Sequence, residues 1–262
     1  MENIDMRAYR TAHHWRIEET EQIVFLIDLA LPDPNTEDLK WLIEHADRLL
    51  GRIRTKLQME AESIKDKERQ ARVNVWIYSS EVLRTAGLVK KDTPHMFYGT
   101  ANATGVHLVA LNMTWNNPQV FDHVTHEMIH HVWSVDVGEA PSLLNEGVAT
   151  YFECLLAKDA AERLERLTSA WQEFAGASTP GFLRRICRND SFWATQVAGN
   201  PMYSIGAEFI AYLLDNHGMQ SVRQIFLRSH FDDDHLDRHI EDVTGESIEV
   251  IEQRISDRTG LA

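Results

Sequence analysis

Two short segments rich in β-branched and aromatic residues, QIVFLIDLAL (22–31) and RVNVWIYSS (72–80), constrain the fold most strongly, because both predict strands. Between them, Thr36 begins a long stretch in which apolar residues recur at helical spacing. These apolar residues are Leu39, Leu42, Ile43, Ala46, Leu49, Leu50, Ile53 and Leu57. Strand, helix and strand in this order predict a β-α-β unit whose helix packs on one face of a sheet.

The sequence pattern changes near residue 115. Before it, GVHLVALN (105–112) predicts a further strand, with MFYG (96–99) as its hairpin partner across the turn-rich GTANAT. After it the spacing becomes helical, and Gly218 marks the end of one apolar run. The predicted helices cover residues 118–134, 141–158, 159–175, 201–216, 219–229 and 247–258. We therefore predict a single α+β domain, 1–262, with a twisted mixed sheet and its crossover helix in 1–115 and a mainly helical half in 116–262.

Composition narrows the possible partners. The 262-residue chain has a net charge of −14, which repels phosphate backbones, so we expect no nucleic-acid partner and favour a basic or neutral ligand. The N-terminal MENIDMRAYRTAHHWRIEETE lacks the apolar core of a secretory signal, and no apolar run is long enough to span a membrane. We therefore expect a cytoplasmic protein without membrane attachment. Cys154 and Cys187 are too few for a disulfide framework and are expected to be buried thiols.

The segment DHVTHEMIHH (122–131) lies in the first of these predicted helices and contains an HExxH pattern. Residues four apart differ by about 40° around a helix, so His126 and His130 point in nearly the same direction and can bind one metal ion. Zinc suits such a pair, with nitrogen ligands at ~2.0 to 2.1 Å. Glu127 lies about 100° further round, where its carboxylate can reach a water bound to that ion without displacing it.

A catalytic zinc site needs a third protein ligand, and the sequence offers two candidates. The first is Asp136, because HEMIHHVWSVD resembles the metzincin pattern HExxHxxGxx(H/D). In that pattern a glycine ends the helix sharply so that the chain can return the third ligand, whereas Trp133 occupies the position here.

The second candidate is Glu146, in LLNEGVATYFE (143–153). Pro141 marks the first turn of a new helix after the loop VDVGEAP, and two antiparallel helices joined by a short loop would bring Glu146 across from the two histidines. Thr150 and Glu153 lie within about 40° of the Glu146 direction on that helix. Either side chain is therefore placed to accept a hydrogen bond from a ligand histidine.

HEMIH followed by LLNEGVATYFE resembles the gluzincin metallopeptidases of the peptidase MA clan, particularly the M1 aminopeptidase-like catalytic domain, whose helices carry HExxH and then W-L-NEG-x-A-x-Y-x-E. The resemblance implies a zincin-like fold, with the HExxH helix between the sheet and the helical half. It also implies zinc as the cofactor and a role for each matching residue. His126, His130 and Glu146 match the zinc ligands, Glu127 the general base, and Glu153 a carboxylate that supports the ligands.

Two features depart from the M1 enzymes. The spacer between His130 and Glu146 is shorter, and GTANATGVHLVALN has no glutamate where those enzymes carry GAMEN, so exopeptidase specificity is not implied. That strand is instead expected to offer an edge along which an extended peptide adds as another strand.

Hydrolysis at a zinc site builds negative charge on the former carbonyl oxygen, so a hydrogen-bond donor there lowers the barrier. Tyr203, at the start of the helix in NPMYSIGAEFIAYLLDNHG, is the candidate donor. Its Tyr-x-x-Gly setting resembles the Y-x-K-G element of M1 enzymes, with Ile205 replacing the lysine.

The expected function is zinc-dependent hydrolysis of peptide bonds in a peptide or protein substrate, by a metal-activated water with Glu127 as general base. Two alternatives stay open. One is a non-catalytic or regulatory binding module on a zincin fold, and the other is a metzincin-like protease with Asp136 as the third ligand.

Overall fold

A computed structural model shows an α+β fold that is mostly helical and contains one mixed sheet. It describes residues 14–29, 37–58, 72–79, 98–102, 105–110, 118–177, 180–187, 201–230 and 234–260. The chain divides into two compact units, Met1–His131 and Val132–Ala262. The boundary between the two units falls inside a single continuous helix, α5 (Pro118–Asp136).

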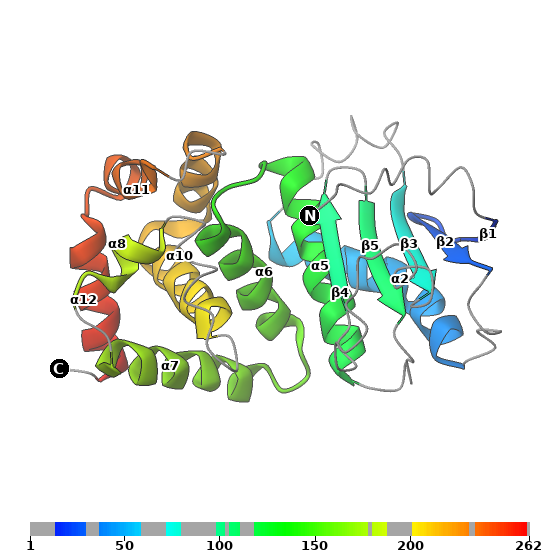
Figure 1. Ribbon diagram of the computed structural model, residues 1–262, viewed down its shortest axis with the longest axis horizontal. Helices are drawn as coiled ribbons and strands as arrows, with labels where there is room; N and C mark the ends of the chain where they lie inside the picture. Colours follow the sequence, from blue (N-terminus) through cyan, green and yellow to red (C-terminus); the bar gives the residue numbers. More distant parts are fainter. Residues whose placement is uncertain are drawn as a thin grey trace. The chain divides into compact units, whose positions relative to one another are not determined.

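The first unit contains a five-stranded sheet with the strand order β1-β2-β3-β5-β4 (Figure 1). Its strands are β1 (Trp15–Glu19), β2 (Ile23–Asp28), β3 (Val73–Ser79), β4 (Tyr98–Asn102) and β5 (Gly105–Ala110). The three central strands are parallel, whereas β1 and β4 are antiparallel edge strands. The strands predicted at 22–31, 72–80 and 105–112 are confirmed. The predicted hairpin is also confirmed, although its first strand begins at Tyr98 and runs on to Asn102.

Strand β1 was not predicted, because three of its five residues, WRIEE, are charged. The strand exists through its backbone pairing with β2, in a register that places Trp15 opposite Asp28. The Trp15 ring also contacts Trp76 and Tyr78 edge-on, with ring centroids 5.1 and 5.6 Å apart. Pairing with a neighbouring strand and this aromatic contact therefore outweigh a polar local sequence.

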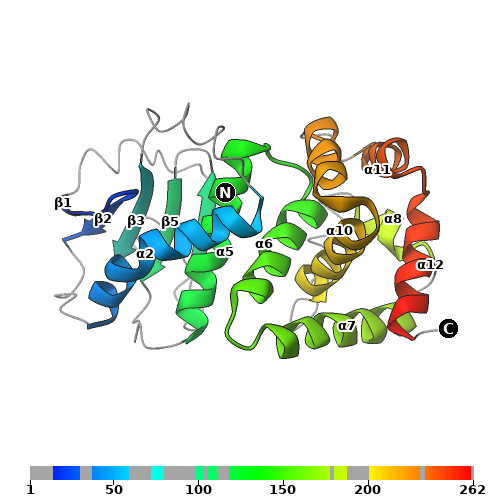
Figure 2. The ribbon, with the colours of Figure 1, turned by 180° about the vertical axis from the view of Figure 1, so that it is seen from behind.

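The β-α-β unit forms as predicted, with β2 and β3 parallel and joined through helix α2 (Glu37–Lys56) (Figure 2). Alternate residues of β2 and β3 and one stripe of α2 form an apolar core. Its members are Ile23, Phe25, Ile27, Val75, Ile77, Leu39, Ala46, Leu50 and Ile53, each no more than 1% exposed. The period of two on the strands and about 3.6 on the helix explains why sequence spacing alone located this core.

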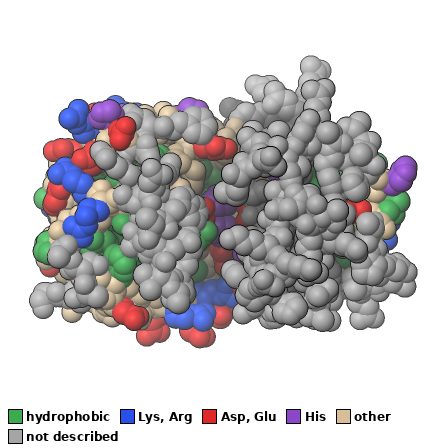
Figure 3. Space-filling model, in the orientation of Figure 1, with side chains coloured by type: hydrophobic (Ala, Val, Ile, Leu, Met, Phe, Trp, Pro, Cys, Tyr) green, Lys and Arg blue, Asp and Glu red, His purple; other side chains and the backbone are tan. Residues whose placement is uncertain are grey.

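Helices make up the second unit, and all the predicted ones that fall in it are confirmed with small shifts at their ends. The described helices of this unit, predicted or not, are α6 (Ser142–Leu156), α7 (Ala160–Ala177), α8 (Phe182–Ile186), α10 (Pro201–Arg228), α11 (Leu236–Thr244) and α12 (Ile248–Thr259). Gly218, at φ 78° and ψ 170°, interrupts α10 where the sequence predicted a helix end. Over this unit, basic side chains lie next to acidic ones (Figure 3), as in the ion pairs of Arg184 with Asp237 and Glu249.

The two short helices α8 and α11 were not predicted. Contacts distant in sequence stabilise α8: the buried Glu252 carboxylate of α12 accepts hydrogen bonds from the backbone N–H groups of Gly181 and Leu183, at 2.7 and 2.8 Å. Both cysteines are free and buried, as predicted, and burial raises the pKa of the Cys187 thiol. Within the described parts of the chain, no helix combines the length and apolar character needed to cross a membrane.

Candidate metal centre

Helix α5 presents two histidines on one face, as their spacing predicted. The Nε2 atoms of His126 and His130 lie 3.1 Å apart, and the two rings are nearly perpendicular, at 76°. Two nitrogens that bind one tetrahedral ion at ~2.0 to 2.1 Å are themselves roughly 3.3 Å apart. The separation of the two Nε2 atoms is therefore close to that of two ligands of one ion.

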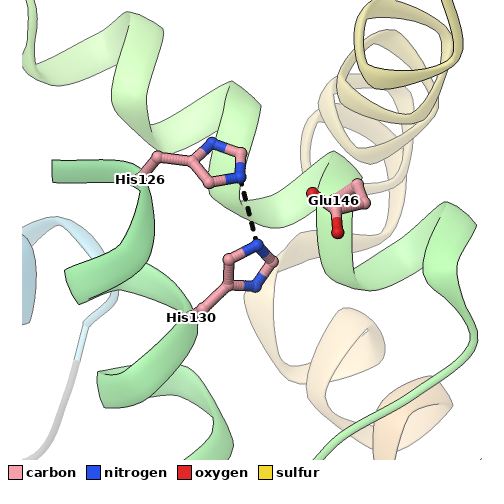
Figure 4. A group of neighbouring side chains, drawn as sticks. All are labelled: His126, His130 and Glu146. Atoms are coloured by element: carbon pink, nitrogen blue, oxygen red, sulfur yellow. Dashed lines mark hydrogen bonds between the residues drawn. The ribbon is translucent and has the colours of Figure 1, made fainter. Parts of the chain in front are cut away.

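Glu146 of α6 is the third member of the group (Figure 4). The ligand atoms offered by His126, His130 and Glu146 all lie within 4.8 Å of one another. Among the described residues these are the ones grouped closely enough to hold a metal ion. Two imidazole nitrogens and one carboxylate oxygen form a donor set that several divalent metals accept.

Several polar residues close to the two histidines in the sequence of α5 are buried. Thr125 is 2% exposed, Glu127 6%, His126 and His131 8% each. Burial of so many polar groups on one helix is costly unless each is hydrogen-bonded or binds a ligand. The helix therefore differs from an ordinary amphipathic helix, because it buries these polar groups in addition to apolar residues such as Met128 and Ile129.

The connection between α5 and α6 is short and tightly hydrogen-bonded. Where α5 ends, the Trp133 carbonyl oxygen accepts from the N–H groups of Val137 and Gly138, at 2.8 and 3.3 Å. Asn145 then binds the backbone of Ala140 with both ends of its amide: Oδ1 accepts from the N–H, and Nδ2 donates to the carbonyl oxygen. Asn145 immediately precedes Glu146, so this pair of bonds holds the first turn of α6 against the loop. Asn145 was not among the predicted site residues.

Pro141 was expected in the first turn of α6. In the structure it is the N-cap residue, one position before the helix begins at Ser142. Its carbonyl oxygen accepts from Leu144 and Asn145 and so begins the helix. The proline still explains where the helix starts, because its fixed φ favours this turn.

Asp136, the other candidate for the third ligand, lies elsewhere. Helix α5 continues through Trp133 to Asp136, without the break that a metzincin-like return of the chain requires. The Asp136 carboxylate forms an ion pair with Arg223 of α10, at 2.6 Å, and it is not a member of the group with the two histidines. The geometry therefore favours Glu146 over Asp136.

Helix α6 meets α10 with no side chain between the two backbones. A Cβ added to Gly147 would lie 2.5 Å from the carbonyl oxygen of Gly206, and one added to Gly206 would lie 2.7 Å from that of Leu143. Tyr203 is in the first turn of α10, one turn before Gly206. The crossing therefore places the helix that carries Tyr203 directly against the helix that carries Glu146. A glycine inside each of two helical patterns was the sequence signal for this contact.

The two residues expected to support the ligands have different surroundings. Glu153 lies 3.5 Å from Arg163 of α7 in an ion pair. Thr150 has a buried Oγ1 without a hydrogen-bond partner among the described residues. A buried hydroxyl left unsatisfied costs about 1–3 kcal/mol, so a polar group bound beside this turn of α6 would be stabilised there. Thr150 follows Glu146 by one helical turn, which is consistent with a polar ligand near the three-residue group.

Comparison of the sequence with models of known protein families and with curated proteins found no match.

Proposed function

We propose that the chain is a zinc-dependent metallopeptidase of the gluzincin type, with a zincin-like fold and an M1-like pair of site helices. The observation that carries this proposal is the approach of His126, His130 and Glu146 to within 4.8 Å of one another. The group joins an HExxH helix to the glutamate of an Asn-Glu-Gly sequence on the next helix. An HExxH on a helix places two histidines on one face, where they can bind zinc, with the glutamate beside them as a general base.

The donor set fits zinc. Catalytic zinc sites use three protein ligands, including the combination of two histidines with one glutamate, and leave one position for water or substrate. When bound, the metal would supply a Lewis acid that polarises a substrate carbonyl and activates a water. The two Nε2 atoms, already 3.1 Å apart, need little rearrangement to share one ion.

Glu127 is the proposed general base. Its carboxylate follows His126 directly in α5 and is 6% exposed, so bulk water is largely excluded from it. It would accept a proton from the attacking water and then donate that proton to the nitrogen of the departing amine. Tyr203 would donate a hydrogen bond from its hydroxyl to the oxygen on which negative charge develops.

The proposed substrate is a peptide or a protein segment in an extended conformation. The strand GVHLVALN (105–112) was expected to offer a free edge, but β5 pairs with β3 on one side and with β4 on the other, so the edge strand of the described sheet is β4. An extended peptide could therefore add to its outer side through backbone hydrogen bonds. The net charge of −14 favours a neutral or basic peptide.

The test combines metal analysis with a peptide-library digest. Protein purified without chelators should contain about one zinc per chain and should cut library peptides, and dialysis against a chelator should abolish the cutting. Mass-spectrometric mapping of the new ends would identify the bonds cleaved. Zinc bound at one per chain with an intact library would point to the binding-module alternative, whereas a metal-free protein would contradict the proposed site altogether.

A further inference from the structure

The five-residue connection between α5 and α6, from Val137 to Pro141, sets the distance between the helix with two candidate ligands and the helix with the third. Its geometry must therefore be held if the three ligand atoms are to stay close together. The structure shows what holds it: the part of α10 that follows the break at Gly218.

Arg223 makes the central contact. Its Nη1 donates to Asp136 Oδ2 at 2.6 Å, and its guanidinium lies over the Trp133 ring, 5.4 Å from the centroid. Arg223 of α10 thus contacts both Asp136, the last polar residue of α5, and Trp133, its last aromatic residue. The charged groups are largely removed from solvent, since the Arg223 side chain is 17% exposed and that of Asp136 is 6% exposed.

Two further contacts come from residues that follow Arg223 along the chain. Phe226 packs edge-on against Trp133, with ring centroids 5.2 Å apart. His230 hydrogen-bonds through Nδ1 to the Glu139 carbonyl oxygen at 3.0 Å, and its ring lies beside Gly138, where an added Cβ would meet Nδ1 at 3.5 Å. The end of α5 and the loop after it are therefore both held by one segment distant in sequence.

These contacts act on the backbone that leads to the ligand. The carbonyl oxygen of Trp133, the residue under the guanidinium, accepts from Val137 and Gly138 and thereby ends α5. From there the chain passes to Ala140, which Asn145 holds against the first turn of α6. A shift of Trp133 would therefore be transmitted through a few hydrogen bonds to Glu146.

We infer that Arg223 is a positioning residue for the proposed metal centre: by holding Trp133 and Asp136 it maintains the α5–α6 connection that keeps Glu146 opposite His126 and His130. This inference rests on the proposed function. It assigns to α10 a second role besides carrying Tyr203, and it gives Asp136 a use other than that of a metal ligand. Arg223 would act through Trp133 and Asp136 rather than on a reacting atom.

The variants must separate positioning from simple stability, because removing one partner of a buried ion pair leaves an uncompensated charge. Arg223→Met is therefore made both alone and together with Asp136→Asn, since removal of both charges is usually tolerated much better. Arg223→Lys keeps the charge but lacks the planar fork and the stacking surface of arginine. Arg228→Met is the matched control, because Arg228 lies on the same helix and forms an exposed ion pair with Asp242, 3.5 Å long.

Two measurements are made on each folded variant: the zinc dissociation constant, by competition with a chromophoric chelator, and hydrogen exchange of the amides of residues 137–145 in the metal-free protein. We expect the double variant to remain folded, to bind zinc about 10-fold or more weakly, and to exchange these amides faster. Arg223→Lys should fall between the double variant and the wild type. Arg228→Met should match the wild type in both measurements.

Zinc affinity within twofold of wild type in the folded double variant, with unchanged exchange, would overturn the positioning role and leave the metal site intact. Failure of the wild-type chain to bind zinc would overturn the metal site and, with it, this role for Arg223.

Discussion

Helices α5 and α6 are consecutive in the chain and both bury apolar side chains, but α5 buries several polar ones as well. Between Thr125 and His131, α5 buries four polar side chains. By contrast, α6 buries an almost entirely apolar set, namely Leu143, Leu144, Gly147, Val148, Ala149, Phe152, Cys154 and Leu156. Under the proposed function, His126 and Glu127 of α5 are buried as a metal ligand and the general base, whereas the apolar and small residues of α6 are buried by packing. On that proposal, α5 supplies most of the reactive groups and α6 supplies one ligand at a defined place.

The two helices are also held in different ways. The end of α5 is held by the long side chain of Arg223, whose contacts can adjust when a neighbour changes. α6 is held where Gly147 meets Gly206, and a backbone-to-backbone contact has no side chain that can move aside. The proposed centre can therefore be disrupted in two ways. A substitution in α5 can remove a reactive group, and a larger side chain in α6 can collide with the α10 backbone.

The largest effects on activity and zinc binding are expected from replacing a glutamate by glutamine on each of the two helices. Glu127→Gln on α5 should lower peptide hydrolysis by about 10²- to 10⁴-fold while zinc content is retained, because a neutral amide cannot accept the proton. Glu146→Gln on α6 should instead weaken zinc binding itself, because it replaces a charged ligand. Zinc content and turnover are measured together on both purified variants.

An active Glu127→Gln variant would remove the general-base mechanism. Unchanged zinc affinity in Glu146→Gln would show that Glu146 is not a ligand, and the contrast between the two helices would be lost.

A smaller effect is expected at Tyr203, whose helix is held against α6 by the glycine contact. Tyr203→Phe should lower kcat by about 10²- to 10³-fold with little change in zinc affinity, because a single hydrogen-bond donor to the transition state is removed. Steady-state kinetics and chelator competition test this prediction. Tyr212→Phe on the same helix is the control, since the Tyr212 hydroxyl donates to Glu246 at 2.9 Å, and it should leave kcat unchanged.

The smallest effect is expected at the close contact between α6 and α10. Gly147→Ala should destabilise the fold by about 1–3 kcal/mol, because its Cβ would lie 2.5 Å from a backbone oxygen and α6 or α10 must shift. Gly51→Ala in α2 is the matched control with the opposite sign: nothing lies within 4 Å of its Cβ, so better helix propensity should stabilise by about 0.5–1 kcal/mol. Urea unfolding of both variants gives the comparison, and an unchanged midpoint for Gly147→Ala would contradict the close crossing.

Much of the fold was predictable because its signals are local. The alternation in β2 and β3, the apolar stripe of α2 and the stop at Gly218 each depend on residues within a few positions of one another. β1 was missed because its stability comes from pairing with β2 rather than from its own charged sequence. α8 was missed because Glu252, far along the chain, accepts the N–H groups at its start.

The candidate site likewise has one part that local spacing predicted and another part that depends on contacts distant in the sequence. The i, i+4 spacing of His126 and His130 was sufficient to place both on one side of α5. The choice between Glu146 and Asp136 was left open by the sequence. It depended on how α5 ends, and the contacts that decide this come from Arg223 and from the loop.

The sequence by itself therefore determined which residue types lie on which face of each predicted helix and strand, because side-chain direction follows the backbone period. Only the tertiary structure decided that Glu146 approaches the histidines, that Asp136 pairs with an arginine, and that two glycines bring α6 against α10. The reason is physical: these outcomes depend on distances between segments up to 87 residues apart, such as Asp136 and Arg223, which local spacing does not encode.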